Sequence, residues 1–171
     1  MTIHTTHPFA DDRPDPVRRL RGRLAGTVTL WTSGTGAGRA GLTVTSWMVA
    51  MGPEARLLAL LDPDSDLLEA LRDNGRAVVQ LLSWPDRQLA EAFAGTAPAP
   101  GGPFRQAAFV DTDHGPRLAS ASSWAAVRLE DEREVGWSVE VTVVVEHAEI
   151  GDDDDPLLHR RGRFQRLGSG A

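Results

Sequence analysis

The chain has 171 residues and a formal net charge of −6, and 41% of its residues are hydrophobic. This length favours one compact domain with a sizeable core, and the lack of cysteine excludes disulfide bonds, thiolate metal sites and a cysteine nucleophile. All 18 basic residues are arginine, which also excludes a Schiff-base lysine. The acidic balance, without a basic stripe interleaved with aromatic residues, argues against a nucleic-acid-binding surface.

The ends of the chain carry no sign of membrane insertion or export. No apolar run reaches the roughly 20 residues of a membrane span, and residues 1–6 lack the basic start and apolar stretch of a secretory signal. We therefore expect a cytoplasmic protein without a membrane partner. Residues 1–17 are rich in proline and acidic residues, which predicts a flexible arm, and the folded domain is expected over residues 18–167 with a short tail over residues 168–171.

The first third of the chain has the alternation typical of β-strands. Residues 27–32 and 42–50 alternate, with a glycine-rich segment between them, which predicts a β-hairpin. Residues 34–38 (Gly-Thr-Gly-Ala-Gly) invite comparison with a dinucleotide-binding fingerprint, but that motif opens a helix and here a strand pattern follows. A hairpin tip is the favoured interpretation. Residues 56–61 are apolar on both faces, which predicts a central strand.

Two short helices are expected next. The first begins at Asp64 or Ser65, either of which is suited to the N-cap, and ends at Gly75. The second begins at Ser83 and ends at Gly95. Leucines at helical spacing in the first helix indicate one apolar face that packs on the core.

The second half of the chain is dominated by strand patterns. Residues 96–103 are rich in proline and glycine and are predicted to form a loop. A strand is expected near residues 124–129, followed by a charged turn over residues 130–134 and by the strongest β-signal of the chain over residues 137–150. Residues 156–164 end the fold. Strands that follow one another and outnumber the helices predict a mostly β fold, an antiparallel β-barrel with a few short helices.

No metal site is expected. The five histidines do not show the spacing of metal ligands. The acidic run over residues 152–155 lacks the spacing and the glycine of a calcium-binding EF-hand loop, so a solvated loop is the favoured interpretation.

Hydroxyl side chains gather in two segments. Thr43, Thr45 and Ser46 lie on or at the end of one predicted strand, and Ser65 lies at the start of a predicted helix. Hydroxyl groups, backbone N–H groups and a helix N-terminus can together hold a phosphate without lysine. The same residues are also explained by the β-propensity of threonine and by helix capping, and these patterns alone leave both interpretations open.

The order of several segments resembles the flavin reductase-like family of FMN-binding split barrels. The resemblance covers about residues 20–167 and rests on residues 41–47 (Gly-Leu-Thr-Val-Thr-Ser-Trp), 60–65 (Leu-Leu-Asp-Pro-Asp-Ser), 76–82 followed by 89–95, and 156–164 (Pro-Leu-Leu-His-Arg-Arg-Gly-Arg-Phe). It implies a split barrel of six or more strands that is usually a homodimer.

The resemblance also implies an activity and a site. Members of this family bind FMN or FAD and pass a hydride from NADH or NADPH to the flavin, so we expect an NAD(P)H:flavin reductase or the reductase component of a two-component flavin monooxygenase, with a monooxygenase as a possible partner. No catalytic acid or base is assigned. The positions that the resemblance implies for the flavin and its phosphate are Thr43, Thr45, Ser46 and Trp47, with Asp62 and Ser65 in the adjoining segment.

Two departures from the family pattern affect this expectation. Many members carry Gly-Asp-His before the long late strand, with the imidazole near the flavin and nicotinamide, whereas residues 135–138 here read Val-Gly-Trp-Ser. Trp137 either stacks on a ring of a ligand or is a core residue at a strand start. Gln80 stands where the family often has asparagine.

Alternative functions therefore stay open. The loss of the Gly-Asp-His turn is compatible with a flavin-binding or flavin-delivering module that has no catalytic activity. A related split barrel could instead use a deazaflavin or pyridoxal phosphate, in which case a cationic phosphate partner would be Arg39, Arg56 or Arg76.

Overall fold

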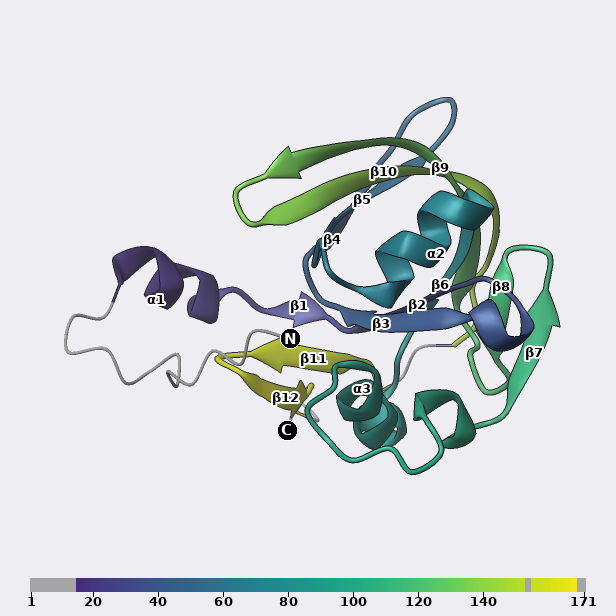
Figure 1. Ribbon diagram of the computed structural model, residues 1–171. Helices are drawn as coiled ribbons and strands as arrows, with labels where there is room; N and C mark the ends of the chain where they lie inside the picture. The colour runs from purple at the N-terminus through teal and green to yellow at the C-terminus, as the bar shows by residue number, and fades with distance from the viewer. Residues whose placement is uncertain (1–14, 153–154, 169–171) are drawn as a thin grey trace.

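A computed structural model describes residues 15–152 and 155–168 of the chain (Figure 1). Within these residues there are three α-helices, α1 (Pro16–Arg23), α2 (Asp66–Asn74) and α3 (Arg87–Phe93). Strands dominate the rest, which confirms the expected mostly β fold. They are β1 (Gly26–Thr27), β2 (Thr29–Ser33), β3 (Ala40–Val44), β4 (Trp47–Ala50), β5 (Arg56–Leu61), β6 (Arg76–Leu81), β7 (Phe109–Thr112), β8 (Gly115–Leu118), β9 (Trp124–Val135), β10 (Ser138–Glu149), β11 (Leu157–Arg160) and β12 (Arg163–Arg166).

The main sheet is a curled, antiparallel arrangement of seven strands in the order β3-β2-β6-β9-β10-β5-β4. The two edge strands, β3 and β4, are consecutive in the chain and are joined only by Thr45 and Ser46. Because two residues cannot cross an open sheet of this width, the sheet has to curl until its edges meet. The backbone N–H of Leu60 on β5 donates to the carbonyl of Ser46 at 2.9 Å. We call this junction of β3, β4 and β5 the seam.

The expected strand over residues 42–50 is therefore wrong in one respect. Its first part pairs with β2, as the predicted hairpin requires, whereas its second part is a separate strand that pairs with β5 on the opposite edge of the sheet. Alternation continues across the junction, so the pattern of side chains does not mark the break. Only the closure of the sheet separates the two strands.

Inside the barrel, α2 closes the core. The helix buries Leu67, Leu68 and Leu71 completely against the inner face of the sheet. Its predicted limits are confirmed, since the Ser65 hydroxyl accepts a hydrogen bond from Leu68 N at 3.3 Å and Gly75 adopts the left-handed conformation at the C-cap, with φ of 67°.

A second core lies on the outer face of β2 and β6. Here α3 packs with β8 and β11 over residues such as Leu30, Leu82 and Leu157. A capping box between Ser83 and Asp86 precedes α3. The helix starts where the sequence predicts, although its first turn, Trp84–Asp86, is a 3₁₀-helix.

The charged turn expected over residues 130–134 is wrong, because these residues extend β9 to Val135. Charged side chains of this segment form three ion pairs. Glu130 pairs with Arg56 at 2.6 Å, Glu132 with Arg72 at 2.8 Å, and Arg133 with Glu140 of β10 at 2.9 Å. Cross-strand and helix-to-strand ion pairs thus replace the apolar contacts that usually identify a strand. The turn lies instead at Gly136 and Trp137, at the tip of the β9–β10 hairpin.

Two expectations for the first third of the chain have different outcomes. The glycine-rich segment is a turn between β2 and β3, as predicted, and Gly34 has a φ of 79° there. A Cβ atom at Gly34 would lie 2.4 Å from the carbonyl oxygen of Gly38, so the turn requires glycine. Strand β5 is flanked by β10 and β4 as a central strand should be. Its outer face is only partly covered, however, since Leu60 is 41% exposed.

At the N-terminus, residues 15–17 do not continue the expected flexible arm. Pro16 stands at the first position of α1, and the Asp15 side chain accepts a hydrogen bond from Val17 N at 2.9 Å. Proline in the first turn and an aspartate N-cap are both helix-start signals. Residues 1–14, 153–154 and 169–171 lie outside the described residues, and with them most of the predicted arm, the centre of the acidic run and the end of the tail.

His159 on β11 gives the fold a predicted dependence on pH. Partial burial, followed by the positive charge of Arg21, lowers the pKa of His159 below its ordinary value. As the pH falls through the ordinary histidine pKa of about 6.5, the unfolded chain binds the proton before the folded one, so the free energy of unfolding decreases. A His159→Gln variant should lose this part of the pH dependence. Denaturant unfolding at about pH 5 and pH 8 measures it, and an unchanged difference between the two pH values would contradict it.

Candidate functional site

The strand register brings most of the predicted site residues together at the seam. Trp47 lies opposite Ala59, and Ser46 is hydrogen-bonded to Leu60 through its carbonyl at 2.9 Å. Thr45 therefore lies beside the end of β5, where Asp62 begins the turn into α2. Segments that are about 20 residues apart in the sequence thus form one continuous surface at this end of the barrel.

Asp62 and Ser65 shape the N-terminus of α2. The Asp62 carbonyl accepts hydrogen bonds from Ser65 N at 3.1 Å and from the Ser65 hydroxyl at 2.7 Å. The Asp62 carboxylate accepts one from Asp64 N at 2.9 Å. Both residues thus have structural roles, and the exposed carboxylate of Asp62 remains accessible to a ligand.

The hydroxyls on the β3 side of the seam differ in their availability. The Thr43 hydroxyl donates to the carbonyl of Ala90 at 2.7 Å and so fastens β3 to α3. Trp47 donates its indole N–H to the carbonyl of Thr27 at 3.0 Å. Among the described residues, the hydroxyls of Thr45 and Ser46 have no hydrogen-bond partner. These two hydroxyls are therefore the donors at the seam that can bind a ligand without breaking a bond of the fold.

The surface around the N-terminus of α2 is negatively charged. Asp62, Asp64 and Asp66 are all exposed around the start of the helix. A phosphate placed at this helix N-terminus would meet three carboxylates, which offset the favourable helix dipole. The part of a ligand that suits this carboxylate-rich side of the seam is one with neutral hydrogen-bond donors, such as hydroxyl or N–H groups, rather than a phosphate.

Two of the arginines considered as phosphate partners have other contacts. The Arg39 guanidinium lies 4.5 Å from the centre of the Phe104 ring. Arg56 is hydrogen-bonded to Glu130 at 2.6 and 2.7 Å. The hydrogen bonds to the Glu130 carboxylate raise the pKa of Arg56, and those from the Arg56 guanidinium lower the pKa of Glu130. Using either of them for a phosphate would require an existing contact to be replaced.

The tip of the β9–β10 hairpin also reaches the seam. Val139 lies opposite Leu61, so the preceding residues Trp137 and Ser138 stand beside the Asp62 turn. Trp137 is 90% exposed. The alternative of a buried core residue is therefore wrong, and a flat apolar ring is presented to solvent next to the predicted site. The sequence alone could not show this proximity, because it follows from the pairing of β10 with β5.

Gln80, the other departure from the family pattern, is a structural residue. Its side chain is fully buried, its Oε1 accepts from Leu118 N at 2.6 Å and its Nε2 donates to the Thr32 hydroxyl at 3.2 Å. Gln80 thus joins β6 to β8 in the interior, away from the seam.

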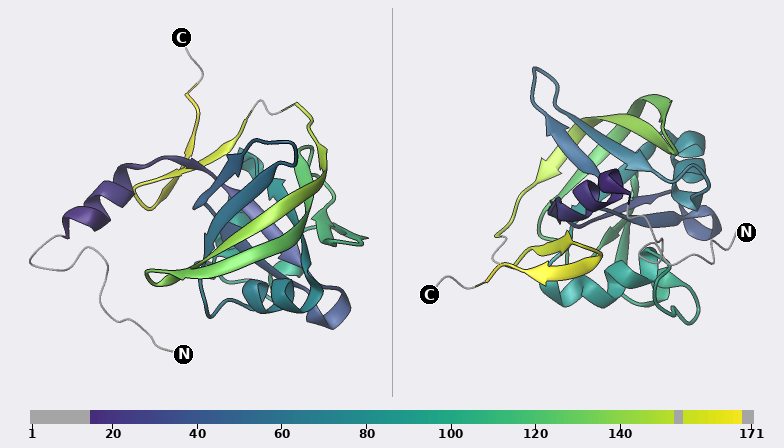
Figure 2. Two further views of the ribbon diagram at one scale, coloured as in Figure 1. Left: turned by 90° about the horizontal axis from the view of Figure 1, so that it is seen from above. Right: turned by 90° about the vertical axis from the view of Figure 1, so that its left-hand side faces the viewer.

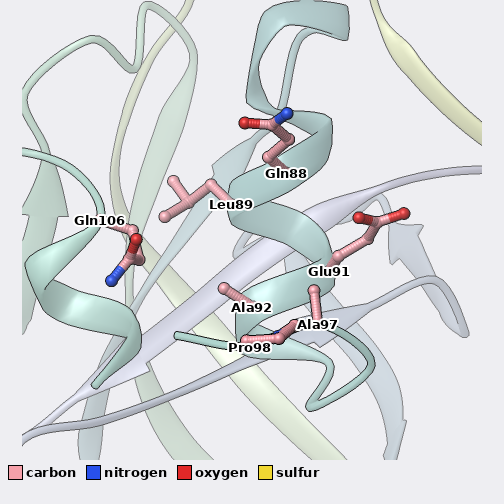
Figure 3. Close-up of a pocket in the computed structure, with 7 residues that line it drawn as sticks. All are labelled: Gln88, Leu89, Glu91, Ala92, Ala97, Pro98 and Gln106. Carbon is pink, nitrogen blue, oxygen red and sulfur yellow. The ribbon is translucent and has the colours of Figure 1, made fainter. Parts of the chain in front are cut away.

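The predicted site residues line neither of two cavities that the described residues form. One cavity of about 280 Å³ lies between α3 and the loop that contains Ala97, Pro98 and Gln106 (Figure 3). Another of about 290 Å³ is lined mainly by serine and aspartate side chains, including Ser83, Asp86 and Ser122. No pattern in the sequence predicts either cavity. At the seam Ser46 is exposed, and Thr45 and Trp47 are partly exposed.

Comparison with protein families identifies the fold and its class. The family model for the flavin reductase like domain matches residues 21–168. The chain belongs to this family. The resemblance seen in the sequence is thereby confirmed, and the match includes the entire seam.

Relatives of this flavin reductase-family protein include a reductase component of a monooxygenase. The chain is 26% identical over 161 residues to the reductase component of 4-hydroxyphenylacetate 3-monooxygenase from Pseudomonas aeruginosa. The match covers 92% of this chain and 94% of that protein.

Solved structures agree with the split-barrel fold. Flavin reductase PheA2 has a TM-score of 0.81 at 23% identity, over 93% of this chain and 99% of its own. The NADH:FAD oxidoreductase SgcE6 of Streptomyces globisporus has a TM-score of 0.81 at 22% identity, over 94% and 99%. That oxidoreductase has also been solved in complex with NAD and FAD fragments.

Two further features of the described residues bear on function. None of their helices is long and apolar enough to cross a membrane. Nor do three or more His, Asp or Glu side chains within residues 15–152 and 155–168 come together as a group that could hold a metal ion.

Proposed function

We propose that this protein is an NAD(P)H-dependent flavin reductase that binds FMN, or FAD, at the seam and supplies reduced flavin to a separate monooxygenase. The observation that carries the proposal is the pair of unpartnered hydroxyls of Thr45 and Ser46 at the seam of a chain that belongs to the flavin reductase-like family. The relative from Pseudomonas aeruginosa, a monooxygenase reductase component, supports the partner.

The residues at the seam suit different parts of a flavin. Thr45 and Ser46 can donate hydrogen bonds to phosphate oxygens. The carboxylate of Asp62 can accept hydrogen bonds from ribityl hydroxyls or from a ring N–H. Trp137 offers a large apolar face for stacking against a planar ring. Positioning of this kind is the protein's main contribution when the ligand carries the reactivity.

When bound, the flavin supplies the redox chemistry by accepting a hydride from the nicotinamide. The chain's own residues bind and orient the two ring systems. Because hydride transfer between stacked rings needs no protein acid or base, the scarcity of titratable groups other than carboxylates at the seam does not oppose the proposal.

A combined binding and turnover experiment tests the proposed function. FMN and FAD should each be titrated into the protein with flavin fluorescence as the readout, and oxidation of NADH and NADPH should be followed with and without flavin. We expect micromolar binding of at least one flavin and nicotinamide oxidation well above that of free flavin. The absence of any change in flavin fluorescence would contradict the assignment.

A flavin-binding module without catalysis is the second candidate. The observation that favours it is the Gly-Trp-Ser sequence at residues 136–138, which places no imidazole beside the seam. It predicts flavin binding together with nicotinamide oxidation no faster than free flavin alone, so the same experiment distinguishes the two functions.

We extend the proposal to a homodimer that acts in the cytoplasm. The exposed apolar side chains of the outer barrel face, together with the open seam, support a partner subunit. Since the chain has no cysteine, its fold depends on no disulfide and suits a reducing compartment. Light scattering coupled to size exclusion measures the oligomeric state.

Replacement of Thr45 by valine tests the proposed flavin contact. The change keeps the shape and removes one hydroxyl, so the dissociation constant for FMN should rise about 2- to 12-fold, which corresponds to a hydrogen bond of about 0.5–1.5 kcal/mol. Riboflavin lacks the phosphate and should be affected less. Thr43→Val provides the comparison, because its hydroxyl is already bonded to Ala90. It should lower stability more than FMN affinity, and the reverse ranking of the two variants would contradict the assignment.

A further inference from the structure

Strand β1 lies between the seam and the β11–β12 hairpin. A Cβ atom at Gly26 would lie 3.1 Å from the carbonyl oxygen of Thr45, and the indole N–H of Trp47 donates to the carbonyl of Thr27 at 3.0 Å. On its other side β1 pairs with β11, where His159 lies opposite Gly26. The hairpin is therefore one strand away from the proposed flavin site.

Helix α1, which precedes β1 in the chain, is attached to the same hairpin. The carbonyl of Gly22 accepts a hydrogen bond from Arg161 N at 3.0 Å, and the carbonyl of Arg23 accepts one from the Arg160 guanidinium at 3.3 Å. Figures 1 and 2 show the helix and the hairpin side by side, both next to β1. Since both bonds use backbone carbonyls of α1, the attachment does not depend on the side chains of the helix.

These two neighbouring segments concentrate positive charge. Residues 16–25 and 156–168 contain eight arginines and no acidic residue, whereas the rest of the chain has ten arginines against 24 aspartates and glutamates. Burial, and after it the positive charge of Arg21, lowers the pKa of His159, so α1 and the hairpin also interact electrostatically. We call Arg21, Arg23, Arg160 and Arg161 the arginine rim.

The side chains of the arginine rim are accessible to an anionic ligand. Arg21, Arg23 and Arg161 are exposed, and within the part of the chain that the structure describes none of these three guanidinium groups forms an ion pair. Arg56 and Arg133 on the main sheet, by contrast, are each paired with a glutamate. A guanidinium without a carboxylate partner can bind a phosphate without the loss of an ion pair.

The arginine rim is close enough to the seam to contact the same ligand. Thr45, proposed above as a phosphate donor, lies against Gly26, and Arg23 is only three residues before Gly26. The Cα atoms of Arg23 and Gly26 are therefore at most about 11 Å apart, a distance that a long arginine side chain can largely span. FMN carries one phosphate, whereas FAD carries a second one joined to the first through a single bridging oxygen.

We propose that the arginine rim binds the second phosphate of FAD, so that this chain holds FAD more tightly than FMN. The proposal rests on the proposed flavin site at the seam and adds the groups that distinguish the two flavins. Thr45 and Ser46 serve the phosphate that both flavins share. The guanidinium groups of the rim, which can donate two parallel hydrogen bonds to a phosphate, serve the one that FAD alone carries.

Calorimetric titration with FAD and with FMN tests the arginine rim without depending on turnover. The double variant Arg21→Gln/Arg23→Gln removes two charges of the rim and keeps both bonds that attach α1 to the hairpin. Arg76→Gln is the matched control, because Arg76 is exposed and its carbonyl accepts from the Ser33 hydroxyl, at the opposite end of β2 from the seam.

We expect the native chain to bind FAD more tightly than FMN. The double variant should lose about 10-fold in FAD affinity, close to the effect of one charge-assisted hydrogen bond, and no more than about 3-fold in FMN affinity. Arg76→Gln should match the native chain for both flavins. Added salt should weaken FAD binding more in the native chain than in the double variant, because it screens the exposed arginines.

Three other results would contradict the proposal. Equal affinities of the native chain for FAD and FMN, or equal losses of both in the double variant, would overturn the role of the arginine rim. A raised KM for NADH with unchanged FAD affinity would also overturn it, because the arginines would then serve the diphosphate of the nicotinamide coenzyme. In each of these cases micromolar FMN binding would leave the proposed reductase function standing, whereas binding of neither flavin would overturn both.

Discussion

A Leu68→Ala variant is expected to lose about 2–5 kcal/mol of unfolding free energy, the range found for buried leucine truncations that leave a cavity. Leu68 is fully buried where α2 enters the barrel. The helix packs against β2, β3 and β6, so the cavity would be enclosed on several sides by strands that cannot move together without changing their register.

Denaturant unfolding followed by tryptophan fluorescence measures the effect. Trp31 lies in the same core cluster and reports on its integrity. Val110→Ala, at a position that is 45% exposed on β7, is the control and should stay within about 0.5 kcal/mol of the native chain. A loss for Leu68→Ala no larger than for this control would show that α2 does not contribute to the barrel core.

The same variant bears on the seam. The turn from Asp62 to Ser65 is held by hydrogen bonds that α2 helps to maintain, since the Ser65 hydroxyl accepts from Leu68 N. Loosening the helix should therefore weaken flavin binding even at concentrations of denaturant where the protein remains folded. Fold and proposed function are coupled through this capped helix N-terminus.

Local signals in the sequence were sufficient for α2 and α3, whereas α1 was not predicted. The limits of α2 follow from a serine N-cap and a glycine C-cap, both of which act within one turn of the chain. The same holds for Ser83 before α3. Features that depend on pairing between distant segments were not predictable in this way.

The closure of the barrel is the clearest such feature. Nothing in the alternation of residues 42–50 marks the crossing at Thr45 and Ser46, because the chain stays extended on both sides of it. The charged end of β9 is a second case. Glu130 and Glu132 are stable in a strand through Arg56 and Arg72, which come from β5 and α2, and single-sequence patterns contain no record of such partners.

The candidate site was predictable as a set of segments but not as a set of atoms. Family resemblance indicated Thr43, Thr45 and Ser46 together. In the fold they differ, because the Thr43 hydroxyl donates to the carbonyl of Ala90 on α3 and is not available to a ligand. Trp137 was left with two interpretations, and the exposed position at the hairpin tip excludes the buried one. The contact with α3 and the exposure of Trp137 decide these points, and both arise only in the folded chain.

Replacement of Gln80 by leucine is expected to lower the unfolding free energy by about 1–3 kcal/mol, the cost of leaving one buried backbone N–H without a partner. The change keeps an apolar stem of similar size, so packing is largely preserved. What it removes is the acceptor for Leu118 N and the donor to the Thr32 hydroxyl. Strand β8 would then be held to β6 by side-chain packing, and to β2 by the remaining bond from the Thr32 hydroxyl to the Pro116 carbonyl.

The exchange of the Leu118 amide with deuterium distinguishes this mechanism from general destabilisation. In Gln80→Leu this amide should lose more protection than amides of β5, which lies on the other side of the barrel. Gln88→Leu, at an exposed position on α3, is the matched control and should change neither quantity. Because Gln80 lies away from the seam, FMN affinity at full folding should stay within about twofold of the native value. A selective loss of flavin binding would instead place the amide in the site and contradict the structural role argued for it.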